Sequence, residues 1–229
     1  MSILIFIGTT TRLDGSTDSA IHKQPVRSPL HCGREGLTGD QQQDRRHHGG
    51  PDRALHYYPR EHYAYWEMFW QAMELPTPAT RLIPAAFGEN LSDTGLLEEQ
   101  VNIGDIFTLG DAVLQVSQPR SPCFKLNIRF GYPQMSLIQQ SSGRTGWLFR
   151  VLQEGEVSPD DSLKLHELST SNLSVRTCLD ILYNRPFNRE DLELLAHHKT
   201  LSAGWKRHAA HRLESGQPEH WGKRLFNRS

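Results

Sequence analysis

The sequence predicts a mainly β domain with a few helices, built as a barrel or a sandwich and followed by a small three-helix bundle. Up to about residue 170, short apolar runs alternate with Gly, Pro and Asp turn signals. Beyond that point, three segments show helical apolar spacing behind capping residues. The length of 229 residues fits one large domain with a small appendage. We therefore expect domains at 1–170 and 171–216, and a loose basic tail at 217–229.

The strands are expected from the start of the chain. The apolar run SILIFIG (2–8) is too short for a secretory core or a membrane span, which favours a first strand and a cytoplasmic protein. The polar stretch 9–38 is long for a connection and is expected to contain short strands or a functional loop. Residues 105–118 read as a hairpin with a turn at Gly110-Asp111. Residues 146–168 repeat that pattern, with turns at 154–155 and 159–160.

Two helices are expected within the β region. One covers 59–73, with Pro59 at its first position and His62 on its apolar stripe. The other ends at Gly143.

Three further helices are expected after residue 170, each with its own N-terminal capping residue. The predicted caps are Ser174, Asn188 and Ser202.

Composition excludes several classes of partner and compartment. A formal net charge of −1 gives no general attraction to nucleic acid or to anionic membranes. The three cysteines fit no disulfide framework and no CxxC zinc pattern, which favours a reducing compartment.

The first candidate site is the segment around two glycines, Gly49 and Gly50. His48, Asp52 and Arg53 lie within a few residues of this tight backbone path. Exposed amides beside a guanidinium suit a phosphate or another oxyanion. The same residue types are also typical of an ordinary surface turn.

The second candidate is the loop at 86–96. Gly88 supplies backbone freedom, and Glu89 and Asn90 offer a carboxylate and an amide to a heteroaromatic edge. A purely structural loop, with Asn90 holding its own backbone, fits equally well.

The third candidate is Cys123. Pro119 and Pro122 fix the backbone around it, and Arg120 and Lys125 are its nearest cations in the sequence. A cysteine on such a turn, partly exposed and flanked by cations, favours the thiolate, which can attack an electrophile or bind a soft metal. The alternative is a buried packing cysteine, which is the usual role of this residue type.

The other sulfur and nitrogen ligands carry less weight. Cys178 lies in the middle of a predicted helix and is expected to pack in a core, and Cys32 is expected to be incidental. A zinc site is disfavoured because the sequence has no HExxH motif and His62 fits the helix stripe.

Taken together, these segments resemble the MOSC family, the domain named after the C-terminal part of molybdenum cofactor sulfurase. The resemblance follows, in order, GLTGDQQQD, HGGPDRALHYYPREHY, FGENL, VNIGDIF, QVSQPRSPCFKLN and TGWLFRVL, and extends from about Ser19 to Leu213. It is closest to small bacterial members with a C-terminal three-helix domain. These include a molybdenum-dependent reductase of N-hydroxylated purines such as 6-hydroxylaminopurine.

The resemblance implies a distorted MOSC-type β-barrel that binds the molybdenum cofactor, Mo-molybdopterin. The cysteine of the family's SPC motif, the protein ligand to molybdenum, falls on Cys123, which would be both the metal ligand and the catalytic residue. The implied cofactor-binding residues are His48, Gly49, Gly50, Asp52, Arg53, Phe87, Gly88, Glu89, Asn90, Arg120, Ser121 and Lys125. The chain departs from the family pattern at His47, where an aliphatic residue is expected, and follows it only loosely over 24–35.

The implied activity is reduction of N-hydroxylated substrates, such as hydroxylaminopurines and amidoximes, by oxygen-atom transfer to the metal. The sequence has no dinucleotide fingerprint and no iron–sulfur spacing, so a separate flavoprotein or ferredoxin-like electron donor is expected. The resemblance also makes a homodimer plausible. Two alternatives stay open: a carrier of molybdenum cofactor or sulfur without turnover, and a non-enzymatic binding module.

Overall fold

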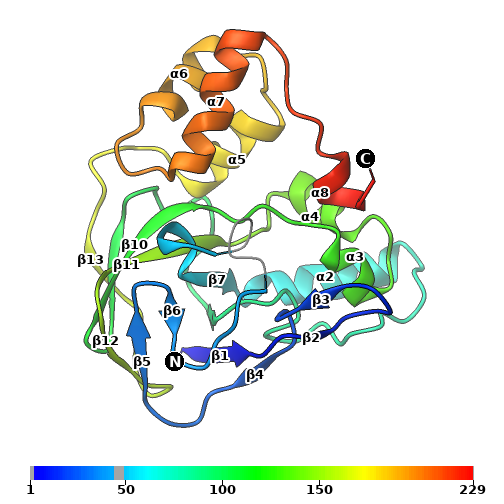
Figure 1. The fold of residues 1–229 in the computed structure, drawn as a ribbon, viewed down its shortest axis with the longest axis vertical. Coiled ribbons are helices and arrows are strands. Elements are labelled where there is room, and N and C mark those ends of the chain that lie inside the picture. The colour runs from blue at the N-terminus through cyan, green and yellow to red at the C-terminus, as the bar shows by residue number, and fades with distance from the viewer. Residues whose placement is uncertain (1–2, 44–48, 229) are drawn as a thin grey trace.

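The computed structural model describes residues 3–43 and 49–228, which form a mixed β-sheet domain with helices, followed by a helical region (Figure 1). The strands are β1 (Leu4–Gly8), β2 (Thr11–Arg12), β3 (Asp18–Ser19), β4 (Lys23–Pro25), β5 (Leu30–Gly33), β6 (Gly36–Leu37), β7 (Leu55–Pro59), β8 (Leu91–Asp93), β9 (Ile106–Leu109), β10 (Ala112–Pro119), β11 (Trp147–Gln153), β12 (Gly155–Val157) and β13 (Lys164–Glu167). The helices are η1 (Pro51–Arg53), α2 (Glu61–Ala72), α3 (Lys125–Phe130), α4 (Met135–Ser142), α5 (Val175–Tyr183), α6 (Arg189–His197), α7 (Ala203–Ser215) and α8 (Gly222–Phe226). The stretch 9–38 contains short strands, as predicted.

The largest sheet has eight strands in the order β13-β9-β10-β11-β7-β8-β1-β4. Its described pairs are antiparallel except β7 with β8. The predicted hairpin is confirmed: β9 pairs with β10 across Gly110-Asp111.

The pairing predicted for 146–168 is wrong. Both edges of β11 are occupied, by β10 and by β7, so β12 turns away and pairs with β5 in a three-stranded sheet. β13 in turn pairs with β9. A strand inside a sheet has no free edge for its sequence neighbour.

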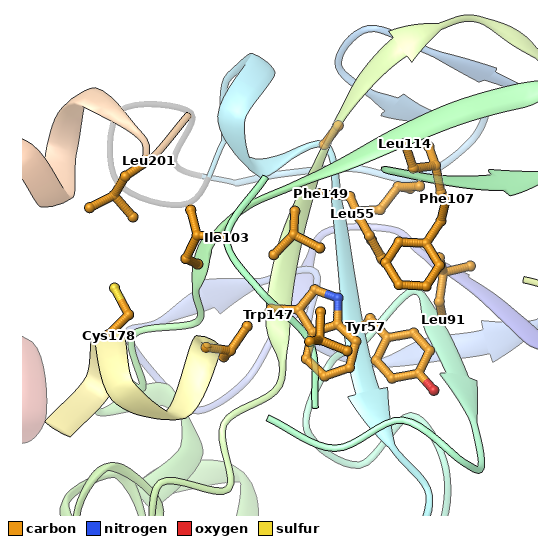
Figure 2. Packing of buried hydrophobic residues seen from close by; sticks show 14 of the residues in the cluster. Leu55, Tyr57, Leu91, Ile103, Phe107, Leu114, Trp147, Phe149, Cys178 and Leu201 are labelled. Carbon is orange, nitrogen blue, oxygen red and sulfur yellow. The ribbon is translucent and has the colours of Figure 1, made fainter. Parts of the chain in front are cut away.

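One apolar cluster runs from the sheet into the helical region, and Figure 2 shows part of it. Tyr57 stacks on Trp147 with ring centroids 4.4 Å apart. Cys178, on α5, points toward Ile103 and Leu201 in the same cluster. The packing role predicted for Cys178 is therefore confirmed.

A second apolar cluster lies between α2 and α3. Its aromatic residues include Tyr58, Trp66 and Phe87, and the indole N–H of Trp66 donates to the Tyr58 hydroxyl at 2.6 Å. The helix begins at Glu61 rather than at Pro59, because Pro59 is the last residue of β7, where it is paired with β8. Full burial of a side chain such as that of Phe87 stabilises the fold by roughly 1.5–3 kcal/mol.

The three predicted helical caps are confirmed. The side chains of Ser174, Asn188 and Ser202 each accept a backbone N–H of the first turn of α5, α6 and α7. These helices gather at one end of the molecule (Figure 1), and the Ser202 N–H donates to Ser117 of β10 at 2.9 Å. The boundary near residue 170 stays a prediction.

The expectation of a loose tail at 217–229 is wrong for residues 222–226. Residues 222–226 form α8, which returns to lie beside α3 and α4 (Figure 1). Leu225 is buried, and its carbonyl accepts hydrogen bonds from Asn127 and Ser136. These contacts order a segment whose composition alone suggested disorder.

Among the described residues, no helix combines the length and the apolar character that crossing a bilayer requires.

Candidate functional site

The turn that carries Cys123 joins the end of β10 to the start of α3. Its backbone is tied at both ends, since the Arg120 N–H donates to Gly146 at 3.1 Å and the Cys123 carbonyl accepts from the Leu126 N–H at 3.0 Å. Two prolines, Pro119 and Pro122, restrict it further. Cys123 is 7% exposed, so the turn is more enclosed than the sequence predicted.

Arg120 connects this turn to the loop at 86–91. Its guanidinium donates to the Phe87 carbonyl at 3.3 Å and to the Gln139 side chain at 2.8 Å. Burial lowers the pKa of Arg120, and the electrostatic interaction with Cys123 opposes that shift. The guanidinium of Arg120, a cation predicted near the cysteine, is therefore held in place by Phe87 and Gln139.

The loop itself is fixed by its glycine and its aromatic residue. Gly88 has φ 76°, and a Cβ at this position would lie 2.7 Å from Ile21 Cγ1. Phe87 is fully buried and stacks on Tyr58 with ring centroids 4.5 Å apart. A side chain at Gly88 would therefore strain the backbone and displace Ile21.

Glu89 and Asn90 use their side chains to hold other parts of the protein. The Glu89 carboxylate accepts from the Tyr63 hydroxyl at 2.5 Å and from the Ala85 N–H at 2.6 Å, and burial raises its pKa. The Asn90 side chain accepts from the His56 N–H at 3.1 Å. The structural interpretation of this loop is thus supported, and contacts of these two residues with a cofactor stay a prediction.

The segment with the two glycines enters the site through η1. Gly50 has φ 95°, a conformation that favours glycine, and precedes the short helix. Asp52 pairs with Arg150 of β11 at 2.8 Å, and its carbonyl accepts from Ser117 of β10 at 2.6 Å. Because β10 leads directly into the Cys123 turn, this contact connects the two-glycine segment to that turn through β10.

Fewer contacts define the positions of the remaining predicted site residues. His48 lies outside the described residues, as does His47. Arg53 ends η1, and its N–H donates to the Gly50 carbonyl at 2.8 Å. Ser121 lies on the turn and Lys125 begins α3.

Sequence reasoning missed a buried ion pair next to the loop at 86–91. Lys23 and Asp40 meet at 2.5 Å, and the Asn90 amide donates to Asp40 at 2.8 Å. Burial lowers the pKa of Lys23, while the pairing with Asp40 opposes that shift. The two residues belong to short irregular strands and loops, where no periodic pattern marks them.

Sequence reasoning also missed Arg224, which it assigned to the loose tail. Its guanidinium donates to the Pro122 carbonyl and, at 2.6 Å, to the Gln140 side chain. It is therefore a second cation at the Cys123 turn.

A groove of about 430 Å³ borders the Lys23–Asp40 pair. It is polar, and Asp40 and Gln41 contribute to its wall. Its lining residues are Thr10, His31, Gly33, Glu35, Gly36, Leu37, Thr38, Asp40, Gln41 and Gln42.

No cluster of three or more His, Cys, Asp or Glu side chains able to hold a metal occurs in the described part of the chain. His62 is buried, and its imidazole lies 2.8 Å from Glu98, so it is a packed residue as predicted. A metal at Cys123 would have to bring most of its own ligands.

Comparisons with known proteins identify the class to which this fold and site belong. The MOSC domain matches residues 44–164, and the YiiM-like 3-alpha helix domain matches residues 173–216. The chain therefore belongs to the MOSC-domain family, in the group that carries the YiiM-like helical domain.

One curated relative matches nearly the whole chain, and another matches about two thirds of it. It is 40% identical to Protein YiiM of Escherichia coli K12 over 98% of this chain and 97% of that protein. The crystal structure of Escherichia coli YiiM superimposes with a TM-score of 0.80 at 36% identity, over 98% of both chains. A Gibberella moniliformis protein named reductase is 42% identical over 68% of this chain, a match that spans 27% of that protein.

Proposed function

We propose that this protein is a molybdenum-cofactor-dependent reductase of N-hydroxylated bases such as hydroxylaminopurines, and of amidoximes. The observation that carries the proposal is the setting of Cys123, a single thiol on a turn fixed by hydrogen bonds, with Arg120 beside it. Membership of the MOSC family and a partial relative named reductase support an oxidoreductase.

The residues present fit such a cofactor. In the part of the chain that the structure describes, Cys123 is a soft thiol without a neighbouring cluster of protein ligands, which suits a metal that brings its other ligands, as the dithiolene of a pterin does. Two buried polar atoms next to this turn, Gln118 Oε1 of β10 and Arg224 Nε of α8, have no hydrogen-bond partner among the described residues. Buried polar atoms without a partner are rare in native structures, and a bound ion or polar group is one way to satisfy them.

Cys123 would hold the metal, and the glycine segment would hold the phosphate end of the cofactor. The backbone at Gly49 and Gly50 and the guanidinium of Arg53 are the proposed anion contacts, with His48. Asp52, paired with Arg150, holds that segment in place. The cofactor contacts next to the cysteine would come from Arg120, Ser121 and Lys125. The opposite wall of the site would be the loop that contains Phe87, Gly88, Glu89 and Asn90.

When bound, the cofactor supplies the oxygen-accepting chemistry that this chain lacks. The overall reaction turns an N–OH group, two electrons and two protons into N–H and water. The chain's part is to orient Cys123, to exclude water and to stabilise negative charge with Arg120. The electrons would come from a separate flavoprotein or ferredoxin-like donor in the cytoplasm, and a homodimer stays a prediction.

The test combines metal analysis with a turnover assay. Protein made in a host that synthesises the cofactor is analysed for molybdenum, and then assayed for reduction of 6-hydroxylaminopurine and of an amidoxime with an artificial electron donor. Bound molybdenum with turnover supports the proposal. Bound cofactor without turnover favours a carrier. The absence of both bound cofactor and turnover favours a binding module.

A further inference from the structure

The turn around Cys123 is held by a segment about a hundred residues further along the chain. Arg224 hydrogen-bonds the residues on both sides of the cysteine. Its guanidinium donates to the Pro122 carbonyl, and its own carbonyl accepts from the Phe124 N–H at 2.7 Å. One residue therefore fixes the two peptide groups that set the direction of the Cys123 side chain.

Arg224 can do this because α8 is itself anchored. The Leu225 carbonyl accepts from Asn127 of α3 at 2.7 Å and from Ser136 of α4 at 2.8 Å. The second terminal nitrogen of Arg224 donates to Gln140 of α4 at 2.6 Å. The helix is thus tied to both elements that follow the turn.

The chain that leads to α8 is also fixed. Glu219 accepts from Arg212 of α7 at 2.7 Å and lies 2.7 Å from His208. The ring of Trp221 lies 4.6 Å from the Arg224 guanidinium. These contacts connect the helical region to the Cys123 turn through charged and aromatic side chains.

Tyr183, the last residue of α5, completes the arrangement. Its hydroxyl lies 3.2 Å from the Ser121 hydroxyl, and its ring packs edge-on against Trp221 at 5.9 Å. Two segments after residue 170 therefore contact the turn that bears the cysteine.

We propose that Arg224 is a positioning residue for Cys123, and that the C-terminal segment 219–226 belongs to the site. A metal ligand has to be held to within roughly 0.5 Å and 10–20° of its working geometry. The two Arg224 hydrogen bonds supply that constraint from outside the sequence neighbourhood of the cysteine. The consequence for a metal rests on the proposed function, whereas the constraint on the turn does not.

The test follows alkylation of Cys123 in full-length protein made in a host that cannot synthesise the cofactor. Rates with iodoacetamide are measured by peptide mass spectrometry for wild type, Arg224→Met and Arg224→Lys. Methionine keeps an unbranched apolar stem and cannot donate, so the turn loosens and alkylation accelerates about tenfold, the size expected for losing a charged hydrogen bond. Lysine keeps a cationic donor and rescues part of the effect.

Lys223→Met is the matched control, since Lys223 is the exposed neighbour of Arg224 on the same helix. Its alkylation rate should equal that of wild type. Hydrogen exchange of the peptide that contains Phe124 should also accelerate in Arg224→Met, while strands β9 and β10 stay protected. If Arg224→Met does not fold, the comparison of Arg224→Lys with Lys223→Met decides.

Unchanged alkylation in a folded Arg224 variant overturns the proposal, whatever the protein's activity. A second readout addresses the metal: in protein from a cofactor-producing host, Arg224→Met should retain less molybdenum than Lys223→Met. If alkylation changes and no variant or wild type ever binds molybdenum, the positioning role stands and the proposed function fails.

Discussion

Two cysteines of this protein are almost equally hidden from solvent and have opposite surroundings. Cys178, on α5, is 0% exposed and faces apolar side chains (Figure 2). Burial raises the pKa of its thiol well above the ordinary value. Cys123 is 7% exposed and sits on a turn held by Arg120 and Arg224. The comparison teaches that the exposed fraction alone does not distinguish a thiol packed among apolar side chains from a thiol on a polar turn, whereas the groups around each sulfur do.

The largest effect is expected from Cys123→Ser. Turnover should fall by more than about 100-fold, because replacing groups that only support a metal ligand already costs roughly 10–100-fold. Reductase assays and molybdenum analysis measure it, with thermal unfolding as the check on folding. Full activity in this variant would break the comparison.

The second effect is the difference in native reactivity between the thiols. Cys123 should be alkylated at least about tenfold faster than Cys178, whose buried thiol is disfavoured as the reactive thiolate. Cys32 should resemble Cys178, since burial raises its pKa to about 12. Peptide mapping after timed alkylation of native protein gives the three rates, and equal rates for Cys123 and Cys178 would contradict the distinction.

Cys178→Ser should affect stability alone. A hydroxyl in the apolar cluster around α5 has no partner, so the free energy of unfolding should fall by ~1–2 kcal/mol with turnover unchanged. Urea unfolding with activity measured at the same temperature tests it. A loss of turnover larger than the loss of folded protein would give this residue a role in the site.

The smallest effect is expected from Glu219, whose contacts with Arg212 and His208 hold the segment that leads to α8. Burial raises the pKa of Glu219, but hydrogen bonds from Arg212 and the charges of Arg212 and His208 outweigh it, and the net pKa is lowered from 4.5. A lowered pKa in the folded state stabilises the protein above pH 4.5, and that contribution is lost as pH falls through the lower folded value.

Glu219→Gln should therefore flatten the pH dependence of unfolding below pH 4.5 and speed alkylation of Cys123 slightly at neutral pH. Unfolding curves across an acid pH series measure the first effect, and timed alkylation the second. Glu214→Gln is the control, because Glu214 is exposed near the end of α7 and none of its described contacts involves α8. Identical acid stability of wild type and Glu219→Gln would show that this contact does not support the segment.

The sequence predicted what local patterns encode. The caps at Ser174, Asn188 and Ser202 follow from short side chains at helix starts, and the hairpin from a Gly-Asp turn between apolar runs. The fold class and the family resemblance were likewise correct. What failed was pairing that depends on the occupied edges of a finished sheet, as for β12.

The candidate site was predicted in part for the same reason. The prolines and the cation beside Cys123 are neighbours in the chain, and Arg120 was found. Arg224 was missed because its contact with Pro122 joins residues 102 positions apart, and no periodic pattern in α8 predicts that contact. A segment of five helical residues in a basic stretch looks unstructured until its docking surface is known.

The long sequence separation between Pro122 and Arg224 has a consequence for biosynthesis. The ribosome synthesises the turn that carries Cys123 well before Arg224, so this turn lacks its hydrogen bond from Arg224 while α8 is still untranslated. The turn can therefore take its final conformation only after residues 219–226 have been synthesised and α8 has docked, and the orientation of the Cys123 thiol is set after that step.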